Sequence, residues 1–289
     1  MTQGFLNVLK PPGMTSHDIV SAVRRMYHLK RVGHTGTLDP SAAGVLPVGL
    51  GLATRLIEYL DKDDKSYRAE ITFGWASDTG DDTGEEIARQ AFVMPSEEAI
   101  RRTLASFEGD IEQLPPMYSA IKINGKKLYE LARAGKEVER TARPVRIHKI
   151  TLIERREDAI VIDVDCSKGT YIRTLCIDIG EKLGIPTVLS FLLRTKAGHF
   201  DLSSALTLEE LAELGEDALI PMDQAIADIP SVQLTSQEGI AFENGRAVSI
   251  KECFDNRVRV YVEERFVGIA RIGGNGTKLI PEKVFHADV

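Results

Sequence analysis

Two strand patterns in immediate succession constrain the fold of this chain more than any other feature of its sequence. RIHKITLIE (146–154) and DAIVIDVDCS (158–167) are both typical of strands, and alternate apolar residues share one face of the second. A glycine and Thr170 then open a helix pattern. The apolar residues of this pattern share one helix face: Ile172, Leu175, Ile179 and Leu183. The segment predicts two strands and a helix whose apolar faces turn inward.

Further patterns lie on both sides of this segment. Strands are indicated at 4–10, 67–74 and 257–273, and the apolar stretch 46–60 ends in a helix. Helices are indicated at the capping residues Ser16, Ser96 and Thr207, the last of which forms a capping box with Glu210. Beyond about residue 230 the pattern changes to short strands, which predicts a small β-rich module.

Composition sets the class of protein. A length of 289 residues predicts one large domain plus a small one, and the 43% hydrophobic share is that of a globular chain. No apolar run is long enough to cross a membrane, and the N-terminus lacks a secretory pattern, so a cytoplasmic location is expected. The 3 cysteines form no CxxC pair, which argues against a disulfide framework and against a zinc site.

Charge is distributed unevenly along the chain. The net charge is −7, yet residues 122–149 carry nine basic and three acidic side chains. Residues 1–36 carry five basic side chains and one acidic side chain. Residues 201–256 carry twelve acidic and two basic side chains. A chain polarised in this way can bind a polyanion on one face. A solvated basic helix face beside an acidic surface explains the same counts equally well.

Generic functional motifs are mostly missing. There is no GxxxxGK[ST] phosphate loop, and GLGLAT (49–54) lacks the third glycine of a dinucleotide-binding turn. The histidines occur neither as HExxH nor near a CxxC pair, so a zinc hydrolase is not expected. The acidic turn SDTGDDTGE (77–85) lacks the spacing of an EF-hand and favours a solvated turn over a cation site. We therefore expect no metal.

The loop HTGTLDP (34–40) is the best candidate for chemistry. It combines a carboxylate, a histidine and small turn residues, and loops on a rigid scaffold often carry catalytic groups. Its glycine lets the backbone approach a ligand closely, and Pro40 stiffens the chain after Asp39. Taken alone, the motif is also compatible with a plain Asp-Pro turn.

Several ordered segments resemble the TruB-type tRNA pseudouridine-55 synthases. They are GFLNVLKPPGMTSHDIV, GHTGTLDPSAAGVLPVGLGLATR, YRAEITFG, CSKGTYIRTL and FLLRT, and they run in order through roughly residues 4–200. The resemblance implies an α+β pseudouridine synthase fold with a mixed, mostly antiparallel sheet. It also implies a catalytic domain at 1–230, with a basic thumb-like insertion at about 122–149, and a small PUA-like RNA-binding module at 231–289.

The same resemblance implies roles for individual residues. Asp39 matches the catalytic aspartate that attacks the uridine, and Arg173 matches the arginine that pairs with it. Tyr67 matches the tyrosine that stacks on the target base and can move the proton at its C5. Tyr171 matches a second pocket tyrosine, and Leu192 matches a leucine that lines the base pocket.

Other matches concern RNA and the support of the catalytic loop. His34 matches a histidine that contacts RNA near the flipped nucleotide, and Lys10 lies in a motif that supports the catalytic loop. Leu193 departs from the family pattern, because relatives often have a second arginine there. Five basic residues are expected to contact RNA: Lys122, Lys126, Lys127, Arg133 and Arg143.

The implied reaction is an isomerisation without a cofactor. The bond between uracil N1 and the ribose breaks, the base rotates, and it rejoins the ribose through C5, with a covalent adduct to Asp39 on the way. The base must first flip out of its RNA helix. An adjacent guanidinium is expected to lower the pKa of Asp39 and keep it ionised. The sequence leaves open whether the carboxylate attacks the uracil ring or the ribose.

The expected partner is the T arm of tRNA. We expect no membrane association, no guide RNA and no obligate protein partner, and a monomer. Three alternatives remain at this stage. They are an RNA-binding chaperone of the same fold without catalysis, a synthase that depends on a guide RNA, and a metal-dependent hydrolase built on the acidic turn.

Overall fold

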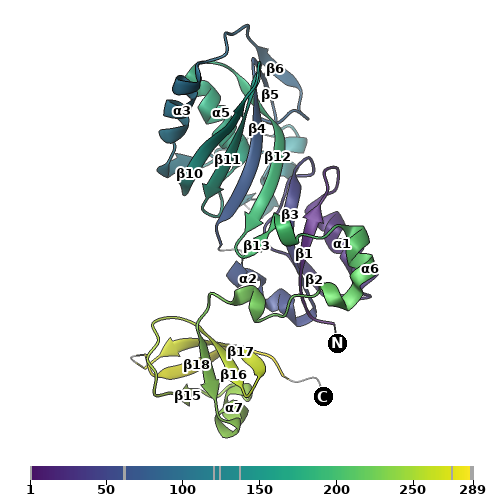
Figure 1. The fold of residues 1–289 in the computed structure, drawn as a ribbon, viewed down its shortest axis with the longest axis vertical. Coiled ribbons are helices and arrows are strands. Elements are labelled where there is room, and N and C mark those ends of the chain that lie inside the picture. Colours follow the sequence, from purple (N-terminus) through teal and green to yellow (C-terminus); the bar gives the residue numbers. More distant parts are fainter. Residues whose placement is uncertain are drawn as a thin grey trace.

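A computed structural model describes residues 2–60, 63–119, 121–123, 125–136, 138–274 and 276–286. Most of the chain forms one mixed sheet with helices against it, and residues from 231 onward form a second, smaller sheet (Figure 1). Within these described residues the larger sheet has nine strands. Its strands are β1 (Gly4–Lys10), β2 (Val32–His34), β3 (Ala43–Leu50), β4 (Lys65–Phe73), β7 (Gly109–Gln113), β10 (Arg143–Arg155), β11 (Ala159–Cys166), β12 (Thr187–Ala197) and β13 (Phe200–Asp201).

Short hairpins and helices complete the structure. The hairpins pair β5 (Trp75–Ser77) with β6 (Glu86–Arg89) and β8 (Lys122–Ile123) with β9 (Lys126–Lys127). The α-helices are α1 (Ser16–Met26), α2 (Ile57–Leu60), α3 (Glu97–Ala105), α4 (Leu128–Arg133), α5 (Ile172–Leu183), α6 (Leu208–Leu214) and α7 (Ser236–Glu243). The 3₁₀ helices are η1 (Gly51–Leu56), η2 (Leu202–Ser204), η3 (Gly215–Ala218) and η4 (Gln224–Ile226).

The larger sheet is mixed and mostly antiparallel, as expected. Its order is β1-β3-β12-β4-β11-β10-β7, and β12 pairs with β3 in parallel at Leu193–Ala43 and Arg194–Gly44. The other pairings in this sheet are antiparallel. The strand β12 therefore joins the N-terminal strands to the long central strands.

The two strands predicted at 146–154 and 158–167 are confirmed as β10 and β11, which pair with each other. The apolar face of β11 packs under α3 and α5, which lie side by side on one face of the long strands (Figure 1). The core there is fully buried at Ile160 and Ile162. Each such side chain removed from water contributes about 1.5–3 kcal/mol to stability.

Helix starts were predicted with mixed success. Ser96 caps α3, and the capping box of Thr207 and Glu210 begins α6, as predicted. The prediction for Ser16 was wrong by one residue, because Thr15 accepts the capping hydrogen bond from the backbone N–H of Asp18. The stretch 46–60 ends in a helix as predicted.

The basic insertion expected at about 122–149 is shorter in the structure. Arg143–Arg155 form β10, which pairs with β7 and β11 in the larger sheet, so residues 143–149 belong to the main body. The hairpin β8–β9 and the short helix α4 precede this strand. The basic side chains of 143–149 therefore extend from a strand that is paired on both sides.

The C-terminal module is rich in strands, as predicted. Its strands are β14 (Ser231–Leu234), β15 (Val248–Ser249), β16 (Val258–Val262), β17 (Arg265–Gly273) and β18 (Lys278–Val284), in the order β14-β16-β17-β18-β15. An apolar cluster joins the module to the rest of the protein, since Ile269 and Phe285 pack with Phe5, Leu56 and Phe200. The module is thus docked through a shared core.

Gly44 is a point at which the sheet depends on one glycine. Its φ is +115°, and a Cβ there would meet the backbone of Arg194 on the neighbouring strand. Gly109 has a similar φ of +104°, but nothing lies near the position of its Cβ. A substitution at Gly109 therefore introduces backbone strain alone, whereas one at Gly44 introduces both backbone strain and steric overlap.

We predict that Gly44→Ala destabilises the protein more than Gly109→Ala. Gly109→Ala should lower the free energy of unfolding by about 1–3 kcal/mol, the strain of an alanine at positive φ. Gly44→Ala should lower it by a further 1–3 kcal/mol or so, the penalty of overpacking. Urea denaturation followed by circular dichroism measures both values. Equal losses for the two variants would contradict the close approach of β3 and β12.

Candidate active site

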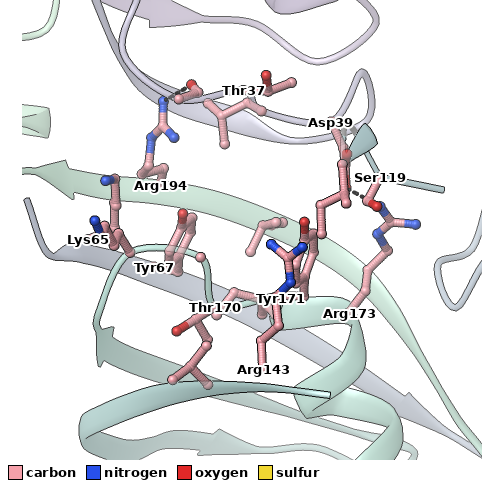
Figure 2. Close-up of a pocket in the computed structure, with 18 of the residues that line it drawn as sticks. Thr37, Asp39, Lys65, Tyr67, Ser119, Arg143, Thr170, Tyr171, Arg173 and Arg194 are labelled. Carbon is pink, nitrogen blue, oxygen red and sulfur yellow. Dashed lines mark hydrogen bonds and ion pairs between the residues drawn. The ribbon is translucent and has the colours of Figure 1, made fainter. Parts of the chain in front are cut away.

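A cavity of about 720 Å³ lies between the loop that follows β2 and the larger sheet. The loop residues Gly36–Asp39 form one wall, and side chains of β4 and β12 form another. The remaining walls are Tyr118 and Ser119, the start of β10, and the turn 168–171 at the start of α5. Figure 2 shows side chains from these separate parts of the chain converging on one space.

Asp39 and Arg173 meet at one end of this cavity (Figure 2). The guanidinium Nη2 lies 2.9 Å from the carboxylate Oδ2, with 6% of the Arg173 side chain exposed and 37% of the Asp39 side chain. Arg173 also donates from Nη1 to the carbonyl of Thr79 at 3.0 Å and from Nη2 to the carbonyl of Tyr118 at 2.7 Å. The guanidinium is therefore fixed by the backbone before it reaches the carboxylate.

The pKa of Asp39 differs from the prediction. Burial in the cavity raises the pKa of the carboxyl, Arg173 opposes this, and the charge of Asp81 raises it further. Desolvation outweighs the ion pair, so the expectation of a lowered pKa was wrong. The carboxylate is still paired with Arg173, which offsets part of the cost of placing an ionised group in a partly buried position.

Asp81 is the carboxylate on the other side of Arg173. Only 8% of Asp81 is exposed, and its Oδ2 lies 4.0 Å from the Nε of Arg173. Its Oδ1 accepts hydrogen bonds from the hydroxyls of Thr79 and Thr83. The interpretation of 77–85 as a solvated turn is wrong at this residue, because the turn packs its central aspartate against the candidate site.

Lys10 supports the loop that carries Asp39. This side chain is fully buried and donates from Nζ to the carbonyls of Pro11 at 2.9 Å, Met14 at 2.6 Å and Pro40 at 3.3 Å. Burial lowers the pKa of Lys10 to about 8, while the negative charge of Asp39 opposes the change. The ammonium thus ties β1 and the turn after it to the residue next to Asp39.

Ser16 fixes the same loop from α1. Its hydroxyl donates to the carbonyl of Leu38 at 3.1 Å and accepts from the N–H of Leu38 at 2.9 Å. Ser16 is buried, and this pair of hydrogen bonds holds its hydroxyl against the loop. The residue mistaken for a helix cap therefore holds the neighbour of Asp39.

Arg194 joins the two ends of the loop. Its guanidinium donates from Nε to the carbonyl of Val45 at 2.7 Å and from Nη2 to the carbonyl of Gly36 at 3.3 Å, and 1% of the residue is exposed. Gly36 lies before Asp39 in the chain and Val45 lies after it. One buried side chain from β12 therefore sets the width of the loop.

Tyr67 lies beside Arg194 at the other end of the cavity from Asp39 (Figure 2). The two residues face each other in the register of β4 and β12, and Leu192 lines the same space. Burial raises the pKa of the Tyr67 phenol, while the Arg194 guanidinium beside it acts in the opposite direction. A phenol at this place stays protonated at neutral pH.

Tyr171 and His34 also line the cavity. Burial raises the pKa of Tyr171, and the positive charges of Arg143 and Arg173 oppose this. Tyr171 is the residue before the first turn of α5, so the sequence expectation that Thr170 opens this helix was one residue early. The structure thus brings together the six residues predicted for catalysis and base binding: His34, Asp39, Tyr67, Tyr171, Arg173 and Leu192.

The predicted RNA-contacting residues are only partly described. The side chains of Lys122, Lys126, Lys127 and Arg133 lie outside the described part of the structure. Arg143 lies on β10 and lines the cavity together with Lys168. The described rim of the cavity is therefore basic.

The described ranges contain neither a cluster of metal ligands nor a membrane-spanning helix. Nowhere in these ranges do three or more His, Cys, Asp or Glu side chains gather as metal ligands. No helix in the same ranges is long and apolar enough to cross a membrane.

Sequence reasoning missed Asp81, Ser16 and Gln113, and it treated Arg194 only as a neighbour of Leu193. A buried polar side chain whose partners lie far away in the chain has no local sequence signal. One indirect signal existed at Ser16, since Thr15 and Asp18 already provide a complete capping box. A helix that begins with this capping box does not need Ser16 as a second capping residue.

Sequence models of protein families match nearly the whole chain. The TruB family pseudouridylate synthase (N-terminal domain) model matches residues 24–172, and the tRNA pseudouridylate synthase B C-terminal domain model matches 173–227. The model for the C-terminal part of pseudouridine synthase II TruB matches residues 230–285. These matches assign the chain to the pseudouridine synthases.

Individual relatives agree with this class. The tRNA pseudouridine synthase B of Alkaliphilus oremlandii is 51% identical over 92% of this chain and 91% of its own length. That of Caldanaerobacter subterraneus is 45% identical over 98% of this chain and 99% of its own length. The chain belongs to the TruB family.

Solved structures show the same architecture. A chain in a Cbf5–Nop10–Gar1 complex matches with a TM-score of 0.77 and 27% identity, over 99% of this chain and 85% of that one. A chain of an H/ACA RNP bound to a substrate RNA containing 2'-deoxyuridine matches with a TM-score of 0.76 and 25% identity. The match covers 98% of this chain and 85% of that one. The expected fold is confirmed, including the PUA-like C-terminal module.

The position of Asp81 generates a prediction about pH. A raised pKa means that Asp39 becomes protonated at a higher pH than an ordinary aspartate, and an activity that needs its carboxylate ionised falls there too. Asp81→Asn removes one cause of the increase while keeping an oxygen for Thr79 and Thr83. We predict that the acid limb of kcat/KM then moves to lower pH, measured as pseudouridine formation across a pH series.

Asp78 provides the control for this experiment, because it is an exposed aspartate in the same turn. Asp78→Asn should leave the acid limb at its wild-type pH. A shift to higher pH in Asp81→Asn would show that Asp81 mainly holds Arg173 in place.

Proposed function

We propose that this protein converts the uridine at position 55, in the T arm of tRNA, to pseudouridine without a guide RNA. The single observation that carries the proposal is the ion pair of Asp39 and Arg173 at the end of a cavity lined by Tyr67 and Tyr171. The relatives named tRNA pseudouridine synthase B match over nearly their full lengths, which supports tRNA as the substrate.

The cavity suits a single planar base taken out of its helix. Two tyrosines and Leu192 offer apolar surface for stacking, and recognition of an unstacked RNA base commonly uses such contacts. Flipping costs a few kcal/mol, roughly, which contacts to the flanking phosphates must offset. Arg143 and Lys168 at the rim are placed to supply them.

Asp39 acts as the nucleophile in this proposal. Its carboxylate forms a bond to the uridine, the N1–C1' bond breaks, and the uracil rotates so that C5 bonds to C1'. The bond to Asp39 then breaks, which releases the product and restores the free carboxylate. Arg173 holds the carboxylate in one orientation and stabilises its ionised form. Whether the first bond forms to the uracil ring or to the ribose is left open by this geometry.

Tyr67 is proposed to move the proton at C5. A buried phenol with a raised pKa cannot remain ionised without help, and the Arg194 guanidinium beside it reduces the penalty for the phenolate. Rejoining through C5 replaces the N1–C1' bond by a C5–C1' bond. The C5 proton leaves, and N1 takes up a proton, so the product is an isomer of the substrate.

The organisation of the chain follows from this assignment. We assign 1–230 to the catalytic domain and 231–289 to an RNA-binding module, with the basic insertion that precedes β10 as an RNA-gripping element. The protein is proposed to act in the cytoplasm as a monomer, with no cofactor. The five predicted basic contacts, from Lys122 to Arg143, keep their proposed role.

A guide-dependent synthase is the second candidate, because the solved structural relatives occur in a Cbf5–Nop10–Gar1 complex and an H/ACA RNP. Their identities of 25% and 27% are much lower than the 51% and 45% of the bacterial relatives. The stand-alone form is therefore favoured.

Substitution of Asp39 tests the nucleophile. Asp39→Asn should abolish tritium release from C5-labelled uridine in a T-arm hairpin, while RNA affinity stays within a few fold, because base chemistry and phosphate contacts are separate contributions. Asp163→Asn is the control, since Asp163 is a half-exposed carboxylate paired with Arg68 on the same sheet. It should keep wild-type release.

Other outcomes separate the alternatives. A chaperone without catalysis releases no tritium in the wild type, and a guided enzyme requires added RNA. A hydrolase requires a divalent metal. Equal losses of turnover and affinity in Asp39→Asn would show that Asp39 holds the fold or the RNA.

A separate prediction concerns the basic insertion. Replacing Lys126, Lys127 and Arg133 by glutamine should weaken RNA binding and flatten its salt dependence, since each lost phosphate contact lowers the slope of log K against log salt by about 0.7–0.9. Fluorescence anisotropy at several salt concentrations measures the slope. An unchanged slope would remove the insertion from the RNA-binding surface.

A further inference from the structure

Gln113 makes an unusual pair of hydrogen bonds next to the candidate site. It is the last residue of β7, and 2% of it is exposed. Its Oε1 accepts from the backbone N–H of Tyr171 at 2.9 Å, and its Nε2 donates to the backbone carbonyl of Tyr171 at 3.3 Å. One side-chain amide therefore holds both backbone groups of one residue.

The residue that is held in this way has two tasks. Tyr171 is the capping residue of α5, yet its side chain makes no capping hydrogen bond and instead lines the cavity. Its backbone lies in an extended conformation, with φ −101° and ψ 108°. An ordinary cap uses its own side chain to fix the first turn, so this helix start takes its support from Gln113.

Further bonds run between the segment after Gln113 and the same helix turn. The hydroxyl of Thr174 donates to the carbonyl of Leu114 at 3.4 Å. Arg173 donates to the carbonyl of Tyr118 at 2.7 Å from the same nitrogen that contacts Asp39. Residues 113–118 thus run along the first turn of α5, bonded at both ends of this stretch.

We propose that Gln113 is a positioning residue for the isomerisation, which sets Tyr171 against the base and Arg173 against Asp39 by fixing the start of α5. This inference rests on the proposed roles of those three residues. Gln113 touches no reacting atom, because it is not among the residues that line the cavity. Its effect reaches the site through the backbone of Tyr171 and through Arg173 two residues later.

The geometry predicts which kinetic constant responds. RNA binding depends mainly on contacts to phosphates, which Gln113 does not make. The chemical step depends on the orientation of Arg173 and Tyr171, and a misplacement of about 1 Å can lower a rate by roughly a hundredfold. A residue that only stabilises the fold would change neither constant in the folded protein.

The test compares four variants on the full-length protein with a T-arm hairpin. Gln113→Met has a similar length but no amide, and Gln113→Asn keeps the amide but is one methylene shorter. Gln113→Glu keeps the acceptor for the Tyr171 N–H and is the conservative variant. Thr187→Val is the matched control, since buried Thr187 donates from Oγ1 to the carbonyl of Cys176 on the same helix at 2.9 Å, away from its start.

We expect Gln113→Met and Gln113→Asn to lower kcat by about ten- to a hundredfold, with KM for the hairpin within about threefold of wild type. Gln113→Glu should lower kcat by roughly two- to fivefold, because one of the two hydrogen bonds to the Tyr171 backbone remains. Hydrogen exchange of the peptide that contains Tyr171 should be faster in the Met and Asn variants. Their acid limb should move to higher pH, because a displaced Arg173 no longer holds the Asp39 carboxylate ionised.

Thr187→Val should lower the melting temperature but keep wild-type kcat, exchange at Tyr171 and acid limb. The proposal is overturned if a folded Met or Asn variant has the kcat of this control. If neither variant folds, Gln113→Glu decides, and wild-type kcat with wild-type exchange in that variant overturns the proposal.

Failure of the proposed function is distinguishable from failure of this inference. If the wild type forms no pseudouridine in the hairpin, the substrate assignment fails, while the exchange measurement still tests the hold of Gln113 on Tyr171. If the wild type is active and exchange at Tyr171 is unchanged in Gln113→Met, only the role of Gln113 fails.

Discussion

The guanidinium of Arg173 is the point at which the separate parts of this site are joined. It contacts Asp39 on the loop after β2, the Thr79 carbonyl in the acidic turn, and the Tyr118 carbonyl before the basic insertion. A buried cation requires partners for its N–H groups, because an unpaired charge in the interior is strongly destabilising. Those partners come from three distant segments. The charge can therefore be buried only when the Asp39 loop, the acidic turn and the segment that contains Tyr118 have all assembled.

The same reasoning explains the other buried cations. Lys10 and Arg194 lie in the interior next to the Asp39 loop, with 0% and 1% of their surfaces exposed. Arg194 donates to carbonyls of that loop and its flank, and Lys10 donates to the carbonyl of Pro40 and to two carbonyls of the turn after β1. The loop thus supplies the acceptors that make these charges tolerable, and the charges in turn hold the loop in one conformation. The rigidity of the candidate nucleophile follows from this mutual dependence.

Much of the fold was predictable from sequence, because periodicity and capping are local properties. The strands β10 and β11 and the helices α3 and α6 lie where alternation and caps placed them. The short length of the basic insertion was not predictable, because β10 extends as far as its pairing with β7 and β11 allows. The six side chains predicted for the site converge on one cavity, whereas Asp81 and Gln113 act through partners that no local pattern reveals.

The three buried cations around the Asp39 loop share a chemical asymmetry. The donors are the side chains of Lys10, Arg173 and Arg194, and apart from the carboxylates paired with Arg173 their acceptors are main-chain oxygens. Every residue type carries such an oxygen, so an acceptor position can change identity without losing the bond, provided that its backbone conformation is kept. A donor position has no such freedom. Substitutions in this region should therefore be tolerated unequally, with sequence drift concentrated on the accepting side of each contact.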